Sequence, residues 1–262
     1  MRGLLILALA LPLAGQSGAD SQAPYYTSGS IVNGASNYPG PISPNAILSL
    51  YGTHLAWNTR ALTASDVAAN QLPPRLPGAG VTVSLNGIYT RLYYVSPTQI
   101  NLLIPADVVP GLDYTIQVVR DGVAGPPVKL PMAVASPGLF LIQADTIAAT
   151  QADGTVITRD APAHPGGFVV LYAAGLGQTI PSTGDGEIPA EARTIVERSS
   201  LQVLVNGVPV PDSSIYYAGV TPGFAGLYQV NVKLPPDCGP DPEIRIAVAG
   251  YTSPEGSRLP VR

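Results

Sequence analysis

The sequence predicts an all-β protein built as two tandem β-sandwich domains behind a secretory signal peptide. Three observations support this prediction: an apolar leader, an internal repeat about one domain long, and short alternating apolar runs separated by glycine and proline. A chain of 262 residues is long enough for two domains of ordinary size. We place the signal peptide at 1–19, the first domain at 31–140 and the second domain at 141–262.

The leader has the parts of a secretory signal in the usual order. Arg2 supplies a positive charge, and the run Leu4–Leu13 is apolar. That run is shorter than the roughly 20 apolar residues that a membrane-spanning helix needs. Small residues at the −3 and −1 positions predict cleavage after Ala19, with Ala14 and Ala23 as alternatives. The mature chain is predicted to have no membrane span. It is expected to be secreted or at the cell surface, or periplasmic if it is not exported further.

Composition favours many short strands over disorder. Hydrophobic residues make up 46% of the chain and charged residues only 11%, so a sizeable core can be buried. Gly and Pro number 28 each and are spread between apolar runs, as in strands joined by tight turns. The net charge of −4, with lysine and arginine scattered singly, argues against a nucleic-acid partner. Cys238 is the single cysteine, so no intramolecular disulfide can form, and we interpret it as a small turn residue, with a reactive thiol as the alternative.

An internal repeat sets the domain organisation. Both copies carry Asn-Gly, then Tyr-Tyr, then Gln-(Ile/Val)-Asn, at a spacing of about 120 to 130 residues, which indicates a duplicated domain rather than a solenoid. An insertion near Gly219–Gly226 accounts for the longer spacing. The matched segments are Asn86-Gly87 with Asn206-Gly207, Tyr93-Tyr94 with Tyr216-Tyr217, Gln99-Ile100-Asn101 with Gln229-Val230-Asn231, and the stretch from Ile47 to Leu55 with that from Val169 to Leu176.

Each copy has the residue pattern of β-structure. Val81–Leu85 alternates apolar and polar residues, which is the period of a half-buried strand. The Asn-Gly pairs stand between apolar runs and tolerate positive φ, so they predict type I′ hairpins. Asp121-Gly122 and Asp153-Gly154 predict further turns, and the frequent turns are typical of a sandwich. The one helical segment that we expect lies within Thr63–Asn70.

Several segments also resemble a known family. Ile47–Leu55 resembles the opening strand of IPT/TIG immunoglobulin-like domains, and the Asn-Gly hairpin and Val95–Asn101 fit the same pattern. The whole mature chain, from residue 31 to 262, resembles a family of uncharacterised C-terminal domains of secreted acidobacterial proteins. The marks are Ala35-Ser36-Asn37, Leu50-Tyr51-Gly52-Thr53, Pro137-Gly138-Leu139-Phe140, the stretch from Leu171 to Gly177 and that from Pro222 to Asn231. The resemblance implies immunoglobulin-like sandwiches and secretion, but no activity and no functional residues.

The sequence has no recognisable catalytic motif. It lacks a Gly-x-Ser-x-Gly elbow, a His-Glu-x-x-His pair and a phosphate-binding loop. The two histidines, His54 and His164, are far apart in sequence and are interpreted as loop or strand-end residues. We therefore predict a protein that is not an enzyme and uses no cofactor.

Three residues are candidates for binding. Trp57 is the only tryptophan and lies just beyond a strand end, so we expect it in a loop, where an exposed indole can stack on a sugar ring. Asp185 and Glu187 flank a glycine, and their carboxylates are a weak candidate for calcium, which prefers oxygen ligands. The alternative for this pair is a solvated acidic turn.

These observations lead to three functional hypotheses. The first is a non-catalytic extracellular module for adhesion or recognition, whose partner is a protein or carbohydrate at the cell surface. The second is a structural spacer, or a sorting and secretion module of the cell envelope. The third is an enzyme whose site has no recognisable motif. Fold alone does not separate them, because β-sandwiches host many functions.

Overall fold

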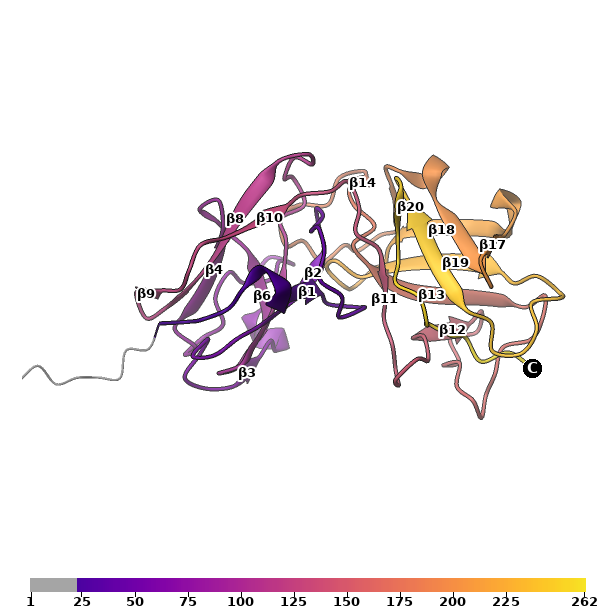
Figure 1. Ribbon diagram of the computed structural model, residues 1–262, viewed down its shortest axis with the longest axis horizontal. Coiled ribbons are helices and arrows are strands. Elements are labelled where there is room, and N and C mark those ends of the chain that lie inside the picture. Colours follow the sequence, from indigo (N-terminus) through magenta and orange to yellow (C-terminus); the bar gives the residue numbers. More distant parts are fainter. Residues whose placement is uncertain (1–22) are drawn as a thin grey trace, which may run out of the picture.

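The computed structural model describes residues 23–262, so the predicted signal peptide lies outside the described residues. In this part of the chain, two antiparallel β-sandwiches lie side by side along the long axis of the molecule (Figure 1). No helix there is long and apolar enough to cross a membrane. The all-β prediction is confirmed.

The first sandwich packs the sheet β1-β2-β7-β6-β3 on the sheet β10-β8-β4-β5, with β9 paired to β8. Its core is filled by side chains from both sheets, such as Leu48, Ile100 and Val83, all fully buried. Its elements are η1 (Ser28–Ser30), β1 (Ile31–Asn33), β2 (Ile47–Tyr51), β3 (Arg60–Ala61), η2 (Ala64–Asp66), β4 (Val81–Leu85), β5 (Ile88–Tyr89), β6 (Arg91–Val95), β7 (Gln99–Leu103), β8 (Asp113–Arg120), β9 (Val123–Ala124) and β10 (Val128–Pro131).

The second sandwich packs the sheet β11-β13-β19-β18-β15-β14, with β12 paired to β13, on the sheet β17-β16-β20-β21. Leu171, Val230 and Ile246 are among its fully buried core residues. Its elements are β11 (Gly138–Leu139), β12 (Ala149–Gln151), β13 (Phe168–Ala174), β14 (Thr179–Ile180), β15 (Arg193–Ile195), η3 (Arg198–Ser200), β16 (Gln202–Val205), β17 (Val208–Pro209), η4 (Asp212–Ser214), β18 (Ile215–Val220), β19 (Tyr228–Lys233), β20 (Ile244–Val248) and β21 (Tyr251–Thr252).

The repeat seen in the sequence is a repeat of strand register. The pair Ile47↔Leu103 in the first domain corresponds to Phe168↔Lys233 in the second. A bulge interrupts the next pairing at the same place in both copies, at Tyr93 and at Tyr216. The Asn-Gly turns have positive φ at both residues, 48° and 85° in the first copy and 50° and 80° in the second, as predicted.

The domain boundary lies earlier than we predicted. Gly138–Leu139 forms β11, which pairs with β13 of the second domain, and Ala135 already belongs to the second core. The first domain also begins before residue 31, because the buried ring of Tyr26 is part of its core. The composition does not change at either boundary, so the sequence contained no signal that would have placed the two boundaries earlier.

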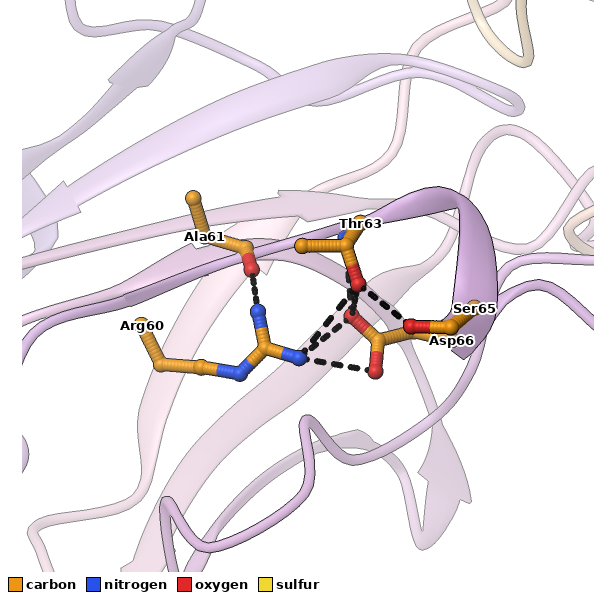
Figure 2. A network of polar contacts seen from close by, with 5 residues as sticks. All are labelled: Arg60, Ala61, Thr63, Ser65 and Asp66. Atoms are coloured by element: carbon orange, nitrogen blue, oxygen red, sulfur yellow. Dashed lines mark hydrogen bonds and ion pairs between the residues drawn. The ribbon is translucent and has the colours of Figure 1, made fainter.

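The expected helical segment is a single 3-10 turn, η2, held by a polar network (Figure 2). The Asp66 carboxylate accepts hydrogen bonds from the backbone N–H and the hydroxyl of Thr63, both at 2.7 Å, and pairs with Arg60 at 2.7 Å. Arg60 also donates to the carbonyl of Ala61. The Thr63 hydrogen bonds, with the Arg60 charge, hold the pKa of Asp66 below its usual value. The network fixes the connection from β3 towards β4.

Candidate functional site

Trp57 lies on the surface at the end of the first domain that points away from the second. Its side chain is 60% exposed, the predicted position for a binding aromatic. The indole is held in place from two sides. Its Nε1 donates a hydrogen bond to Asp121 Oδ2 at 2.8 Å, and the Arg120 guanidinium carbon lies 3.7 Å from the ring centroid. One face of the ring is therefore covered by a cation, and the exposed part is held in a fixed orientation.

The turn between β8 and β9 builds this arrangement. Asp121 and Gly122 both have positive φ, which folds the chain back beside Trp57. Gly80 makes room for the carboxylate, because a Cβ at that position would lie 2.1 Å from Asp121 Oδ1. Arg120 is only 1% exposed, and its Nη1 donates to the carbonyl of His54 at 2.6 Å. Sequence reasoning identified Trp57 and this turn separately, but not their contact.

The two carboxylates that we predicted as calcium ligands each form an ion pair with an arginine. Asp185 binds Arg91 of the first domain at 2.7 Å, and Glu187 binds Arg193 through both carboxylate oxygens, at 2.5 Å and 2.9 Å. The hydrogen bonds from Arg193 and from the Gly184 N–H lower the pKa of Glu187. Within residues 23–262, no group of three or more His, Cys, Asp or Glu could hold a metal ion. The calcium hypothesis therefore stays a prediction for which this loop provides no ligand set.

The Asp185–Arg91 pair links the two domains, but we expect it to contribute little stability. Both side chains are partly exposed, and exposed ion pairs are worth about 0.2–1 kcal/mol. Asp185→Asn should therefore lower the free energy of unfolding by no more than about 1 kcal/mol, measured by urea denaturation. Asp212→Asn, which breaks the 2.7 Å pair with Arg198 inside one domain, is the control. A loss of several kcal/mol for Asp185→Asn alone would contradict this assignment.

The insertion that distinguishes the second repeat forms the apolar part of the domain junction. Ala225 packs against Leu72 and Leu103 of the first domain, and the Tyr93 hydroxyl donates to the Ala225 carbonyl at 2.5 Å. Gly226 approaches so closely that a Cβ there would lie 2.3 Å from Leu103 Cδ1. The sequence marked this segment as an insertion but did not indicate what it contacts.

Buried hydrogen bonds complete the junction. Asn45 Nδ2 donates to the Tyr228 hydroxyl at 3.0 Å, and that hydroxyl donates to the Gly177 carbonyl. Gln178 Nε2 donates to the Ala106 carbonyl at 3.0 Å. Burial raises the pKa of Tyr228 well above its ordinary value near 10, so its hydroxyl stays protonated and can donate. Apolar packing and satisfied polar groups together indicate that the two domains are held in one arrangement.

An open groove also lies at the junction, on the side of loop 33–41. It has a volume of about 120 Å³ and is lined by residues of both domains, among them Tyr38 and Tyr251. Both tyrosine rings are exposed. Because polar and aromatic groups meet there, the groove is a second candidate contact surface. No sequence motif points to it.

The histidines lie in different domains and are both exposed. His54 adjoins the Trp57 loop, and His164 contacts the backbone carbonyl of Arg262 at 3.0 Å. They do not meet in one site. The prediction that the protein is not an enzyme remains untested.

Comparison with protein-family models and with curated proteins finds no match. The solved structures that the chain matches include a surface glycan-binding protein from Prevotella bryantii (TM-score 0.27, 10% identity, 88% of this chain and 41% of that one). A surface glycan-binding protein of the mixed-linkage glucan utilization locus of Bacteroides ovatus, in complex with a heptasaccharide, has a TM-score of 0.30 and 14% identity over 85% of this chain and 42% of that one. The tandem Ig repeats of Dlar give a TM-score of 0.22 and 13% identity over 92% and 95% of the two chains.

The chain spans less than half the length of these two glycan-binding proteins. At such TM-scores the likeness carries no argument about ligand or activity. The β-sandwich architecture of this chain follows from its own strand order and pairing.

Proposed function

We propose that this protein is a non-catalytic recognition module that acts outside the cytoplasm and binds a glycan through Trp57. The observation that supports it is an indole that is exposed yet held in place by Asp121 and Arg120. A side chain that is already ordered loses little conformational entropy on binding. The flat apolar face of the indole suits the C–H face of a sugar ring, and the neighbouring polar groups suit its hydroxyls.

The glycan that fits this surface is neutral. The two charged groups beside the indole, Arg120 and Asp121, are opposite in sign and both engaged with Trp57, so they provide no net attraction for a charged polymer. Stacking and hydrogen bonding are then the main sources of affinity. These interactions act on the sugar ring itself and do not require a particular charge.

Removing the indole should weaken retention on the polysaccharide. In a pull-down with insoluble polysaccharides, peptidoglycan and cells, we expect saturable retention of the mature protein on one polymer. Trp57→Ala should reduce that retention at least tenfold, since an aromatic platform supplies more than about 1.4 kcal/mol to such a contact. Tyr89→Ala removes an equally exposed ring from β5 and is the matched control.

Two results would contradict the glycan proposal. One is retention on none of these polymers by a folded, monodisperse protein. The other is equal retention of wild type and Trp57→Ala, with Trp57→Ala shown to be folded by its circular dichroism spectrum. The second of these would move the site to another surface, such as the Tyr38–Tyr251 groove.

A structural spacer is the second candidate function, and the domain junction favours it. Spacers need a fixed distance between their ends, and a junction with buried hydrogen bonds and apolar packing provides one. Small-angle scattering that matches a single rigid arrangement in solution would support this role. Scattering that requires a broad ensemble of domain orientations would contradict it.

A further inference from the structure

The two domains contact each other through different surfaces, which we call the head and the tail. The head of a domain is the end with the hairpin that joins β6 to β7 or β18 to β19: Ser96–Thr98 in the first domain and Thr221–Leu227 in the second. The tail lies at the opposite end of the same strands. It comprises Ile47, Tyr93 and Leu103 in the first domain and Phe168, Tyr216 and Lys233 in the second.

The internal junction joins the head of the second domain to the tail of the first. Ala225 and Gly226 of that head contact Leu103 and Tyr93 of that tail. Within residues 23–262, neither the head of the first domain nor the tail of the second contacts the other domain, and we call them the free head and the free tail. They lie toward the two far ends of the molecule (Figure 1), and the N-terminal segment runs beside the free head, where Tyr25 pairs with Thr53. When a contact joins two different surfaces of a molecule, head to tail, the same contact can form again between one copy and the next.

The free tail has the features of a contact surface. Tyr216 stands at the same bulge position as the covered Tyr93, yet it is 62% exposed. Its ring lies 5.2 Å from the ring of Phe168, measured between centroids, at an angle of 57°. Phe168 is half-buried and supports the exposed Tyr216 ring, and aromatic side chains are enriched at interfaces.

The free head and the free tail differ from the joined pair in opposite ways. The first domain has a short hairpin without the insertion, so it reaches less far than the loop Thr221–Leu227 does. The free tail carries larger side chains at the positions that this loop contacts in the junction, Phe168 in place of Ile47 and Lys233 in place of Leu103. In a contact between copies, these larger side chains would extend toward the shorter hairpin.

Other residues of the free head are equivalent to residues of the second domain that contact the first domain across the junction. Continuing the strand equivalence along the chain, Trp57 corresponds to Gln178 and His54 to Gly175. Gln178 donates to Ala106, and the Gly175 carbonyl accepts from Ser43, both across the junction.

We propose that the free tail of one copy, formed by Phe168, Tyr216 and Lys233, binds the free head of a second copy. Each association leaves another free head and another free tail, so the assembly grows as a linear chain and does not close at the dimer. This goes beyond the proposed glycan binding and does not depend on it. Because Trp57 belongs to the head, a bound glycan and a second copy compete for that end.

Complementary variants test this contact directly. Thr98→Arg places a charge on the exposed head hairpin, and Tyr216→Arg places one beside Lys233 on the tail. Sedimentation velocity without glycan should show wild-type protein growing in size with concentration, and each variant alone as a monomer. An equimolar mixture of the two should form dimers and nothing larger, because one functional head and one functional tail remain. Tyr89→Arg, outside both surfaces, should behave as wild type.

Wild-type protein that stays monomeric up to millimolar concentration would overturn this proposal. So would association that either single variant leaves intact, or a mixture that fails to form dimers. Glycan pull-down at low protein concentration with Thr98→Arg, which keeps Trp57, gives a separate readout. Loss of self-association and loss of glycan binding are thereby distinguished.

Discussion

Replacing Gly226 with alanine is expected to lower the free energy of unfolding by about 2–4 kcal/mol and to loosen the contact between the domains. The residue has φ of +62°, which a Cβ disfavours, and the added Cβ would lie 2.3 Å from Leu103 Cδ1 and 3.1 Å from the Asn45 carbonyl oxygen. Leu103 is fully buried, so its side chain has no open space to move into. The substitution therefore adds backbone strain to a clash inside the junction.

Gly223 in the same loop provides a matched control for this effect. It has φ of +85°, but nothing lies within 4 Å of a Cβ built there. Gly223→Ala should therefore lower the free energy of unfolding by only the backbone term, about 1–2 kcal/mol. Urea denaturation measures both variants, and limited proteolysis of the junction reports on its opening. Equal losses for the two variants would contradict the close approach of this loop to the first domain.

Tyr228→Phe is expected to lower the free energy of unfolding by about 2–4 kcal/mol at pH 7. The hydroxyl is fully buried and links Asn45 of the first domain to the Gly177 carbonyl of the second. Phenylalanine fills the same space but leaves a buried donor and a buried acceptor without partners. Denaturant unfolding measures the loss. A loss below about 0.5 kcal/mol would show that water or a shift of Asn45 satisfies these groups.

The same hydroxyl makes stability depend on alkaline pH. Burial raises the pKa of Tyr228, and of Tyr93 at the junction, above the value of about 10 that both have in the unfolded chain. Each buried hydroxyl makes its full contribution to the free energy of unfolding below pH 10. That contribution declines as the pH rises above 10, by up to about 1.4 kcal/mol per pH unit, because the unfolded chain then loses the proton that the folded chain keeps. Tyr228→Phe should make the decline of stability with pH between 10 and 11 less steep, by up to about 1.4 kcal/mol per pH unit, while the other buried tyrosines keep their share. An unchanged slope would contradict the claim that the buried Tyr228 hydroxyl contributes to the pH dependence.

Much of the fold was predictable because it follows from local patterns. Asn86-Gly87 and Asn206-Gly207 specify turns that need positive φ, and the alternation in Val81–Leu85 specifies which face of the strand is buried. The repeat of Gln-(Ile/Val)-Asn marks one register in both copies. These signals depend on neighbours in the chain or on internal comparison, and both are visible in one sequence.

The contacts between distant segments were not predictable in this way. Nothing near Gly226 shows that Leu103 lies against it, and nothing near Asp185 shows that Arg91 is its partner. The sequence of the acidic loop suggested calcium but did not show that Asp185 and Glu187 form ion pairs with arginines; calcium binding stays a prediction. Trp57 was identified from its place after a strand end, but its contacts with Arg120 and Asp121 arise from the β8–β9 turn in the folded sandwich.

The most direct test of the central claim uses the fluorescence of Trp57. It is the only tryptophan in the chain, so emission excited at a wavelength that tyrosine does not absorb reports on the proposed glycan site alone. Oligosaccharides cut from the polymer that retains the protein would be titrated into the mature chain, with acrylamide quenching followed in parallel. We predict a saturable blue shift and protection from acrylamide, because a stacked sugar ring removes the indole from water. Emission and quenching that stay unchanged while the protein is fully bound would contradict the claim that Trp57 is the binding platform.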